Sequence, residues 1–156
     1  MSGSPGGFAL PIRKKLPHDI PSWVADGSRY FITINCARRG GDDLVADGRG
    51  LKLLESIAAY EALHKWYMHA MVVMPDHVHM IATFHRIPGI QATIKAWKSF
   101  HARGGGLSWQ SGFFEHRLRN DAEFSEKLSH TLLNPVRKGL VVDWKDWPFT
   151  FVRGSW

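Results

Sequence analysis

Residues 71–84 constrain the fold of this chain more than any other stretch, because they contain two histidines separated by a single apolar residue. Successive side chains of a β-strand point to opposite faces, so His77 and His79 would lie side by side. An apolar row would cover the other face: Val78, Met80, Ala82 and Phe84. Two neighbouring imidazoles can hold a metal ion, but they are also compatible with the solvated face of a half-buried strand. The spacing alone leaves both interpretations open.

The composition indicates one folded domain with an anionic partner. The chain has 156 residues, and 20 Lys and Arg against 14 Asp and Glu give a formal charge of +6. This balance favours nucleic acid as the partner class. The single Cys36 excludes an internal disulfide, and no apolar run has the length of a membrane span. We expect a soluble cytoplasmic protein, associated with the nucleoid, with no membrane partner.

The order of periodic segments predicts an α+β fold. Strands are expected at 29–36, 66–73, 77–84 and 112–118, and helices at 51–65, 90–102 and 120–133. This order matches a ferredoxin-like split βαβ sandwich, an antiparallel sheet with helices on one face, followed by an added C-terminal helix. Residues 1–27 are expected to form an irregular arm and residues 28–156 the domain. Residues 146–151 should pack back as an aromatic tail.

Two helices carry patterns that locate their caps and buried faces. Leu54, Ile57 and Ala58 have the spacing of a buried stripe in the first long helix. Asn120 is placed as the N-cap of the last helix, with Glu123 three residues later as in a capping box.

A third metal ligand could come from the last helix. Glu126, His130 and Asn134 follow one another at i, i+4 spacing, away from the apolar stripe. If this face lies over the sheet, the Asn134 carbonyl oxygen could join His77 and His79 as a ligand. Such a set suits Mg²⁺ or Mn²⁺ and could accept Zn²⁺ or Co²⁺. Alternatively, Asn134 only satisfies backbone groups before Pro135.

Four segments in register give the chain a specific resemblance. Residues 74–80 (MPDHVHM) resemble the paired-histidine (HUH) motif of the IS200-like transposases, and more narrowly of the REP-associated tyrosine transposase branch. Three further segments agree with that branch in order and spacing: 109–120 (WQSGFFEHRLRN), 133–141 (LNPVRKGLV) and 146–149 (DWPF). The resemblance covers most of residues 28–151.

The resemblance implies a single-strand DNA endonuclease and transferase that recognises hairpins and uses a divalent metal, with Mg²⁺ or Mn²⁺ favoured. By this resemblance, His77, His79 and Asn134 would be the metal ligands. The metal would position a phosphate for attack by a tyrosine hydroxyl, which leaves a covalent phosphotyrosine link. Single-stranded or hairpin DNA is the implied partner, and the protein would act as a monomer or homodimer.

One position departs from the family pattern. The nucleophilic tyrosine of the family corresponds to residue 130, where this chain has His130. The three tyrosines, Tyr30, Tyr60 and Tyr67, lie outside the last helix. Three explanations stay open: His130 attacks phosphate itself, it acts as a base for hydrolysis, or the chain has lost strand transfer and retains hairpin binding. The third is favoured.

The resemblance and the charge pattern together select residues expected near DNA. They are Lys95, Lys98, Arg103, Trp109, His116, Arg117, Arg119, Arg137 and Lys138. For each basic residue alone, a solvated surface position is the alternative. A ferredoxin-like RNA binder is a further alternative, although it leaves the paired histidines without a purpose.

Overall fold

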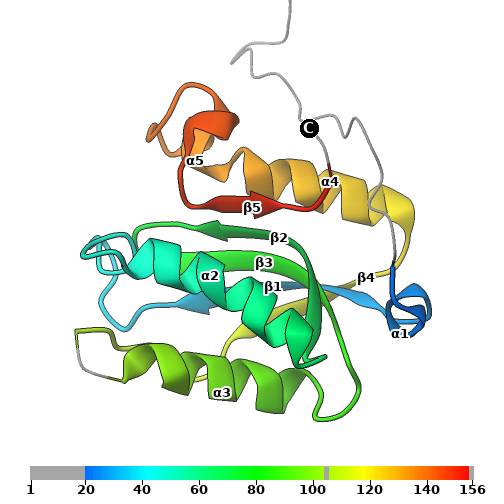
Figure 1. The fold of residues 1–156 in the computed structure, drawn as a ribbon. Coiled ribbons are helices and arrows are strands. Elements are labelled where there is room, and N and C mark those ends of the chain that lie inside the picture. Colours follow the sequence, from blue (N-terminus) through cyan, green and yellow to red (C-terminus); the bar gives the residue numbers. More distant parts are fainter. Residues whose placement is uncertain (1–19, 104–105, 155–156) are drawn as a thin grey trace, which may run out of the picture.

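The computed structural model describes residues 20–103 and 106–154 (Figure 1). Its helices and strands, in chain order, are α1 Ser22–Ala25, β1 Arg29–Asn35, α2 Arg49–Ala62, β2 Trp66–Val73, β3 His77–Phe84, α3 Ile90–Ala102, β4 Phe114–Leu118, α4 Asp121–Leu132, α5 Asn134–Arg137, the 3₁₀ turn η1 Trp144–Asp146 and β5 Thr150–Val152. Each expected strand and long helix is present. The helical turn α1 falls inside the segment expected to be an irregular arm, whose residues 1–19 lie outside the described part.

The strands form one antiparallel sheet in the order β4-β1-β3-β2-β5. The first four have the order of a ferredoxin-like sheet, with α2 and α3 as the connecting helices, so the predicted α+β fold is confirmed. β3 is central, and its His79 lies opposite Thr33 of β1. The strand β5 was not expected: the aromatic tail returns along the edge of β2 as a short strand.

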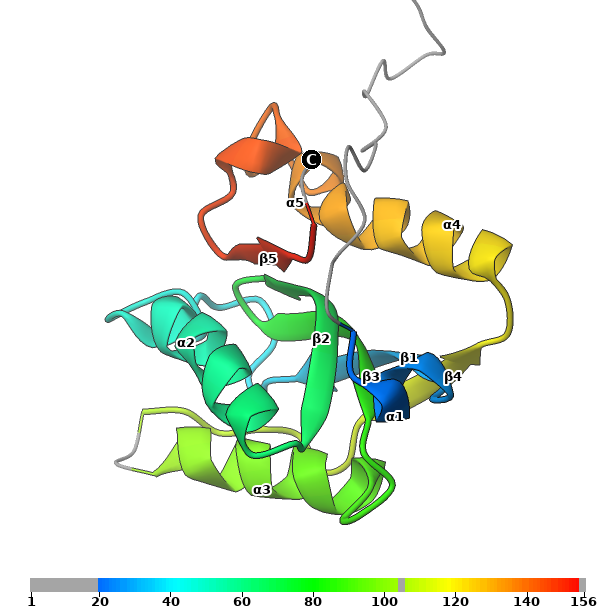
Figure 2. The ribbon, with the colours of Figure 1, turned by 45° about the vertical axis from the view of Figure 1, so that its right-hand side comes forward.

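The sheet has a hydrophobic core on each face. Helices α2 and α3 cover one face, and α4 with α5 covers the other (Figures 1 and 2). The first core contains Trp66, Trp97 and the apolar side of β3, and the second contains Ile81, Leu128 and Leu132. Because β3 alternates, His77 and His79 face the second core, beneath α4 and α5.

The start of α4 follows the predicted cap. The Asn120 side chain accepts a hydrogen bond from the Glu123 backbone N–H at 2.8 Å. The Glu123 carboxylate accepts in turn from the Arg119 backbone N–H at 3.0 Å, one residue earlier than a standard capping box requires. The apolar stripe of α4 is buried as expected, and the helix gives way to α5 at Leu133.

The buried stripe predicted for α2 is confirmed at Ile57, holds in part at Leu54 and is wrong at Ala58. Leu53, Ser56 and Ile57 are buried, whereas Ala58 is exposed and Leu54 only half-buried. The reason is a polar contact: the Ser56 hydroxyl donates to the Leu53 carbonyl at 2.6 Å and accepts from the Trp97 indole at 2.8 Å. A satisfied hydroxyl can occupy a core position, and for this reason the buried face includes Ser56 and not Ala58.

A β-bulge changes the orientation of β2 along its length. The pairing with β3 shifts between Met68 and Ala70. Before the shift, Trp66 and Met68 face the first core; after it, Met71 and Val73 do. The bulge therefore lets Ala70 and Val72 contact α4 and α5 in the second core.

Within the described residues, no helix combines the length and the apolar character needed to cross a membrane.

Candidate metal and phosphate site

The two histidines of β3 lie side by side, as predicted. Their ring centroids are 4.6 Å apart, on the face that α4 and α5 cover. Between and after them, Val78 and Met80 are fully buried in the opposite core. Packing of Val78 and Met80 therefore fixes the strand backbone that carries both histidines. The imidazole rings themselves are fixed by contacts on their own face of the sheet.

Each imidazole is oriented by a hydrogen bond at Nδ1. The His77 Nδ1 lies 2.7 Å from the Asp76 carboxylate, which also accepts from the Gly40 backbone N–H at 2.8 Å. The His79 Nδ1 lies 3.0 Å from the Thr33 hydroxyl on the neighbouring strand. With both Nδ1 atoms engaged, the two Nε2 atoms remain as potential ligands, an arrangement typical of metal-binding histidines.

Both imidazoles are neutral near pH 7. Burial lowers the pKa of His77, and this outweighs the opposing effect of Asp76. Burial lowers the pKa of His79 to about 3, assisted by His77, Lys127 and Arg137. A metal ion binds the neutral form of histidine, so these rings would not need to lose a proton before binding.

Asn134 lies on the same side of the sheet as the histidines. It begins α5 with 7% of its surface exposed, and Leu133 and Val136 beside it pack in the second core. In the described part of the chain, no three His, Cys, Asp or Glu side chains are grouped to hold a metal ion. An amide oxygen, such as that of Asn134, is a suitable ligand for a hard divalent cation.

His130 and His116 share a groove between α4 and β4. This groove has a volume of about 210 Å³ and also contains Glu126 and Lys127. His130 is exposed, and its backbone carbonyl accepts from the Arg137 guanidinium at 2.8 Å. The sequence did not predict that His116 and His130 line one groove, because this depends on how β4 and α4 pack in the folded chain.

Lys127 connects this groove to the paired histidines. Its ammonium lies 4.6 Å from the centroid of the Phe31 ring, and that ring stacks on His79 at 5.3 Å. Lys127 was not among the predicted DNA-binding residues. Its position at i, i+4 from Glu123 and between the apolar turns of α4 resembled an ordinary solvated lysine.

The other predicted DNA-binding residues divide between the two faces. Arg137 and Lys138 lie at the end of α5, near the histidines, whereas Lys95, Lys98 and Arg103 lie on or just after α3 on the opposite face. Exposed Arg117 and Arg119 lie on and just after β4. The structure therefore does not gather all nine residues into one surface.

Lys98 and Trp109 already have partners within the protein. The Lys98 ammonium donates to the carbonyls of Gln110 and Gly112 at 2.8 and 2.7 Å. The half-buried Trp109 indole donates to the Lys98 carbonyl at 2.9 Å and packs against Trp97. Both residues hold the segment between α3 and β4 in place.

The tyrosines do not approach the site. Tyr30 and Tyr60 pack against the core beneath α2 and α3. Tyr67 lies beside His69, whose ring contacts Phe124 of α4, so it belongs to the histidine side. However, Tyr67 pairs with Thr83, four residues from His79 along β3, a separation of about 13 Å at ~3.3 Å per residue.

Comparisons with known proteins find REP-associated tyrosine transposases among the similar proteins. The chain is 29% identical over 129 residues to a REP-associated tyrosine transposase of Escherichia coli K12, covering 80% of this chain and 76% of that protein. It is 28% identical over 99 residues to a provisionally named REP-associated tyrosine transposase of Haemophilus influenzae, covering 52% and 56% of the two chains. Among solved structures, a REP-associated tyrosine transposase bound to a REP hairpin matches with a TM-score of 0.70, 25% identity and coverage of 92% and 82%. No family model matches the chain.

Proposed function

We propose that this chain, which resembles the REP-associated tyrosine transposases in sequence and in fold, binds hairpin DNA with single-stranded flanks. The structurally similar transposase was solved with a REP hairpin. The face of this chain that carries the histidines also presents cations suited to a phosphate backbone: Lys127, Arg137 and Lys138. Burial keeps the paired imidazoles neutral. The positive charge of this face therefore comes from the Lys and Arg side chains, which can reach DNA.

The observation that carries the proposal is the orientation of the paired histidines. His77 and His79 have their Nδ1 atoms held by Asp76 and Thr33, which leaves Nε2 of each free to bind an ion. We assign a divalent metal, Mg²⁺ or Mn²⁺, to these two residues and Asn134. Bound there, such an ion would withdraw charge from a phosphate in the strand. The protein's own part is to align the ligands and to hold the phosphate near Lys127.

Strand transfer through tyrosine is not supported. His130 occupies the position expected for the nucleophile, and Tyr67, the tyrosine on the histidine side, is buried. The function that the site supports best is therefore hairpin recognition with a retained metal and phosphate site, without formation of a phosphotyrosine link.

A second candidate function is metal-dependent cleavage that uses His130. Its exposed imidazole lines the groove that also contains Lys127, and Lys127 lies close enough to affect the pKa of His79. An imidazole placed there could take a proton from water or attack phosphorus directly.

A cleavage assay separates these functions. An end-labelled DNA hairpin with single-stranded flanks is incubated with Mn²⁺ or Mg²⁺ and analysed on denaturing DNA and protein gels. The native chain is compared with His130→Tyr, His77→Ala and, as a matched control, His64→Asn at an exposed position after α2.

We expect the native chain and His64→Asn to bind without cutting, and His130→Tyr to cut and become linked to DNA. Cutting by the native chain that is lost in His77→Ala would favour the second candidate, with a DNA-linked protein band indicating attack by His130. Failure to bind the hairpin, or displacement of the DNA by an equimolar matched RNA hairpin, would contradict the proposal.

A further inference from the structure

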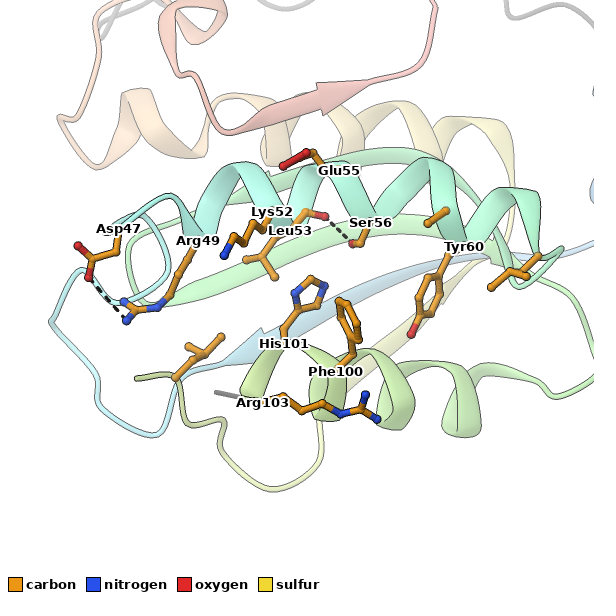
Figure 3. A pocket seen from close by; sticks show the side chains of 13 residues that line it. Asp47, Arg49, Lys52, Leu53, Glu55, Ser56, Tyr60, Phe100, His101 and Arg103 are labelled. Atoms are coloured by element: carbon orange, nitrogen blue, oxygen red, sulfur yellow. Dashed lines mark hydrogen bonds and ion pairs between the residues drawn. The ribbon is translucent and has the colours of Figure 1, made fainter. Parts of the chain in front are cut away.

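A large groove lies between α2 and α3, on the side of the sheet away from the paired histidines. Its volume is about 1030 Å³, sufficient for a nucleotide-sized ligand. Side chains from both helices point into it: Tyr60 from α2, and Phe100 and His101 from α3 (Figure 3). The metal and hairpin site uses none of these residues.

The groove contains exposed aromatic surface. Phe100 is 54% exposed although it is one of the bulky apolar residues of α3, and Tyr60 faces it from the other helix. The Arg103 guanidinium lies 5.8 Å from the centroid of the Phe100 ring. Exposed aromatic rings with a nearby guanidinium form a surface on which a planar ring can stack.

The groove also contains the half-buried imidazole of His101. The His101 Nε2 atom is buried and has no partner among the described residues, while its ring contacts Trp97 and Phe100. Burial lowers the pKa of His101 to about 4, so the ring is neutral near pH 7. Because Nε2 is buried, a ligand in the groove meets only the accessible part of this neutral ring.

Cationic side chains stand at the rim. Lys52 and Arg103 line the groove, and neither forms an ion pair within the described part of the chain. Arg49 is partly engaged, since it donates to the Asp43 carbonyl at 3.0 Å and lies 3.6 Å from Asp47. The lining thus leaves two cations available for a phosphate, near the aromatic surface.

We infer that the groove between α2 and α3 binds a nucleotide, with its base against Phe100 and Tyr60 and its phosphate at Arg103 or Lys52. A planar ring and an anionic group occur together in this class of ligand. The nucleotide could be free or part of an unpaired strand. The inference is independent of the proposed metal site and would hold if that site proved wrong.

Fluorescence quenching of 2-aminopurine tests the inference. One probe is the 2-aminopurine deoxyribonucleoside 5′-monophosphate, and the other is a single-stranded oligothymidylate of 12 nucleotides with one central 2-aminopurine. The full chain is compared with Phe100→Ala and Arg103→Gln, with Val142→Ala and Lys145→Gln as exposed controls outside the groove. Hydrogen exchange of α2 and α3 with and without the oligonucleotide provides a second measurement.

We expect quenching with the oligonucleotide and an affinity loss of about tenfold in Phe100→Ala, as base–aromatic stacking implies. Arg103→Gln should also weaken binding, and both controls should match the native chain. Equal losses with both probes would identify a free nucleotide as a sufficient ligand, and losses with the oligonucleotide alone would identify a strand.

Unchanged affinity in Phe100→Ala and Arg103→Gln would overturn the inference. So would quenching that is lost in His77→Ala but kept in both groove variants, because it would place the probe on the histidine face. If the chain does not bind the hairpin but still binds the probe in the groove, the proposed function is rejected and the inference about the groove stands.

Discussion

At the scale of single residues, Asp76 decides how His77 is presented. Its carboxylate contacts the His77 Nδ1 and also accepts from the Gly40 backbone N–H. Asp76 was not predicted to be a functional residue. It lies in the turn before β3, and Asp is common in turns for purely structural reasons. Only the folded chain shows that one of its oxygens faces the imidazole.

We predict that Asp76→Ala lowers the affinity for Mn²⁺ about 10- to 100-fold, the usual effect of removing a partner of a metal-binding histidine. The imidazole would lose its preferred tautomer and orientation. Isothermal titration of the DNA-free protein with Mn²⁺ measures this effect, and Asp121→Ala, at a side chain 95% exposed, is the control. Equal affinities in the two variants would contradict the role given to Asp76.

The burial of His101 leads to a prediction about how the free energy of unfolding depends on pH. Burial lowers the pKa of His101 from its usual 6.5 to about 4. As pH falls through this window, the unfolded chain binds a proton before the folded chain does, so the free energy of unfolding decreases. Between pH 7 and pH 5 the free energy of unfolding should fall by about 1–2 kcal/mol less in His101→Gln than in the native chain. This figure allows for the partial exposure of the ring. Urea unfolding of both proteins at the two pH values measures it; identical pH dependence would contradict it.

At the scale of elements, α4 places Lys127 near His79 and places His130 in the groove beside β4. The helix is fixed at its start by the Asn120 cap and along its length by Phe124, Leu128 and Leu132. Since the cap satisfies one of the free N–H groups of the first turn, its loss should loosen this turn.

We predict that Asn120→Ala lowers the free energy of unfolding by about 1 kcal/mol, whereas Asn120→Asp, which keeps an acceptor oxygen, changes it little. Urea unfolding followed by circular dichroism provides the measurement. A loss of the same size in both variants would show that the side-chain oxygen of Asn120 does not stabilise the helix.

Some features of the helices and strands could be predicted from the sequence, and others could not. The i, i+2 spacing in β3 was sufficient to place His77 and His79 on one face, and a local cap was sufficient to locate α4. The bulge at Met68 and Ala70 and the strand β5 were not predictable in this way. Both depend on pairing between distant segments, and a bulge reverses the alternation on which a strand prediction relies.

At the scale of the whole molecule, the cations that lie near the two candidate sites are divided between two faces of one sheet. Lys127, Arg137 and Lys138 belong to the histidine face, while Lys52 and Arg103 line the groove on the other. The sequence predicted a basic protein with an anionic partner, but the assignment of each cation to a face required the fold.

We predict that Lys127→Gln weakens binding of a DNA hairpin and reduces the slope of log affinity against log salt by about 1, as expected for one lost phosphate contact. Fluorescence anisotropy at several salt concentrations measures both quantities. Lys145→Gln removes an equal charge at an exposed position on η1 and should leave the slope unchanged. Parallel salt dependences for the two variants would mean that Lys127 acts only through net charge.

The short strand β5 has a consequence for how copies of this chain behave when crowded together. By pairing with β2, and by donating the Arg153 N–H to the carbonyl of His69 at the bulge, it occupies backbone groups that an open sheet edge would offer to a neighbour. The opposite border of the sheet is β4, where Phe114 is exposed. Self-association through strand pairing, as at the high concentrations of expression or crystallisation, would therefore begin at β4.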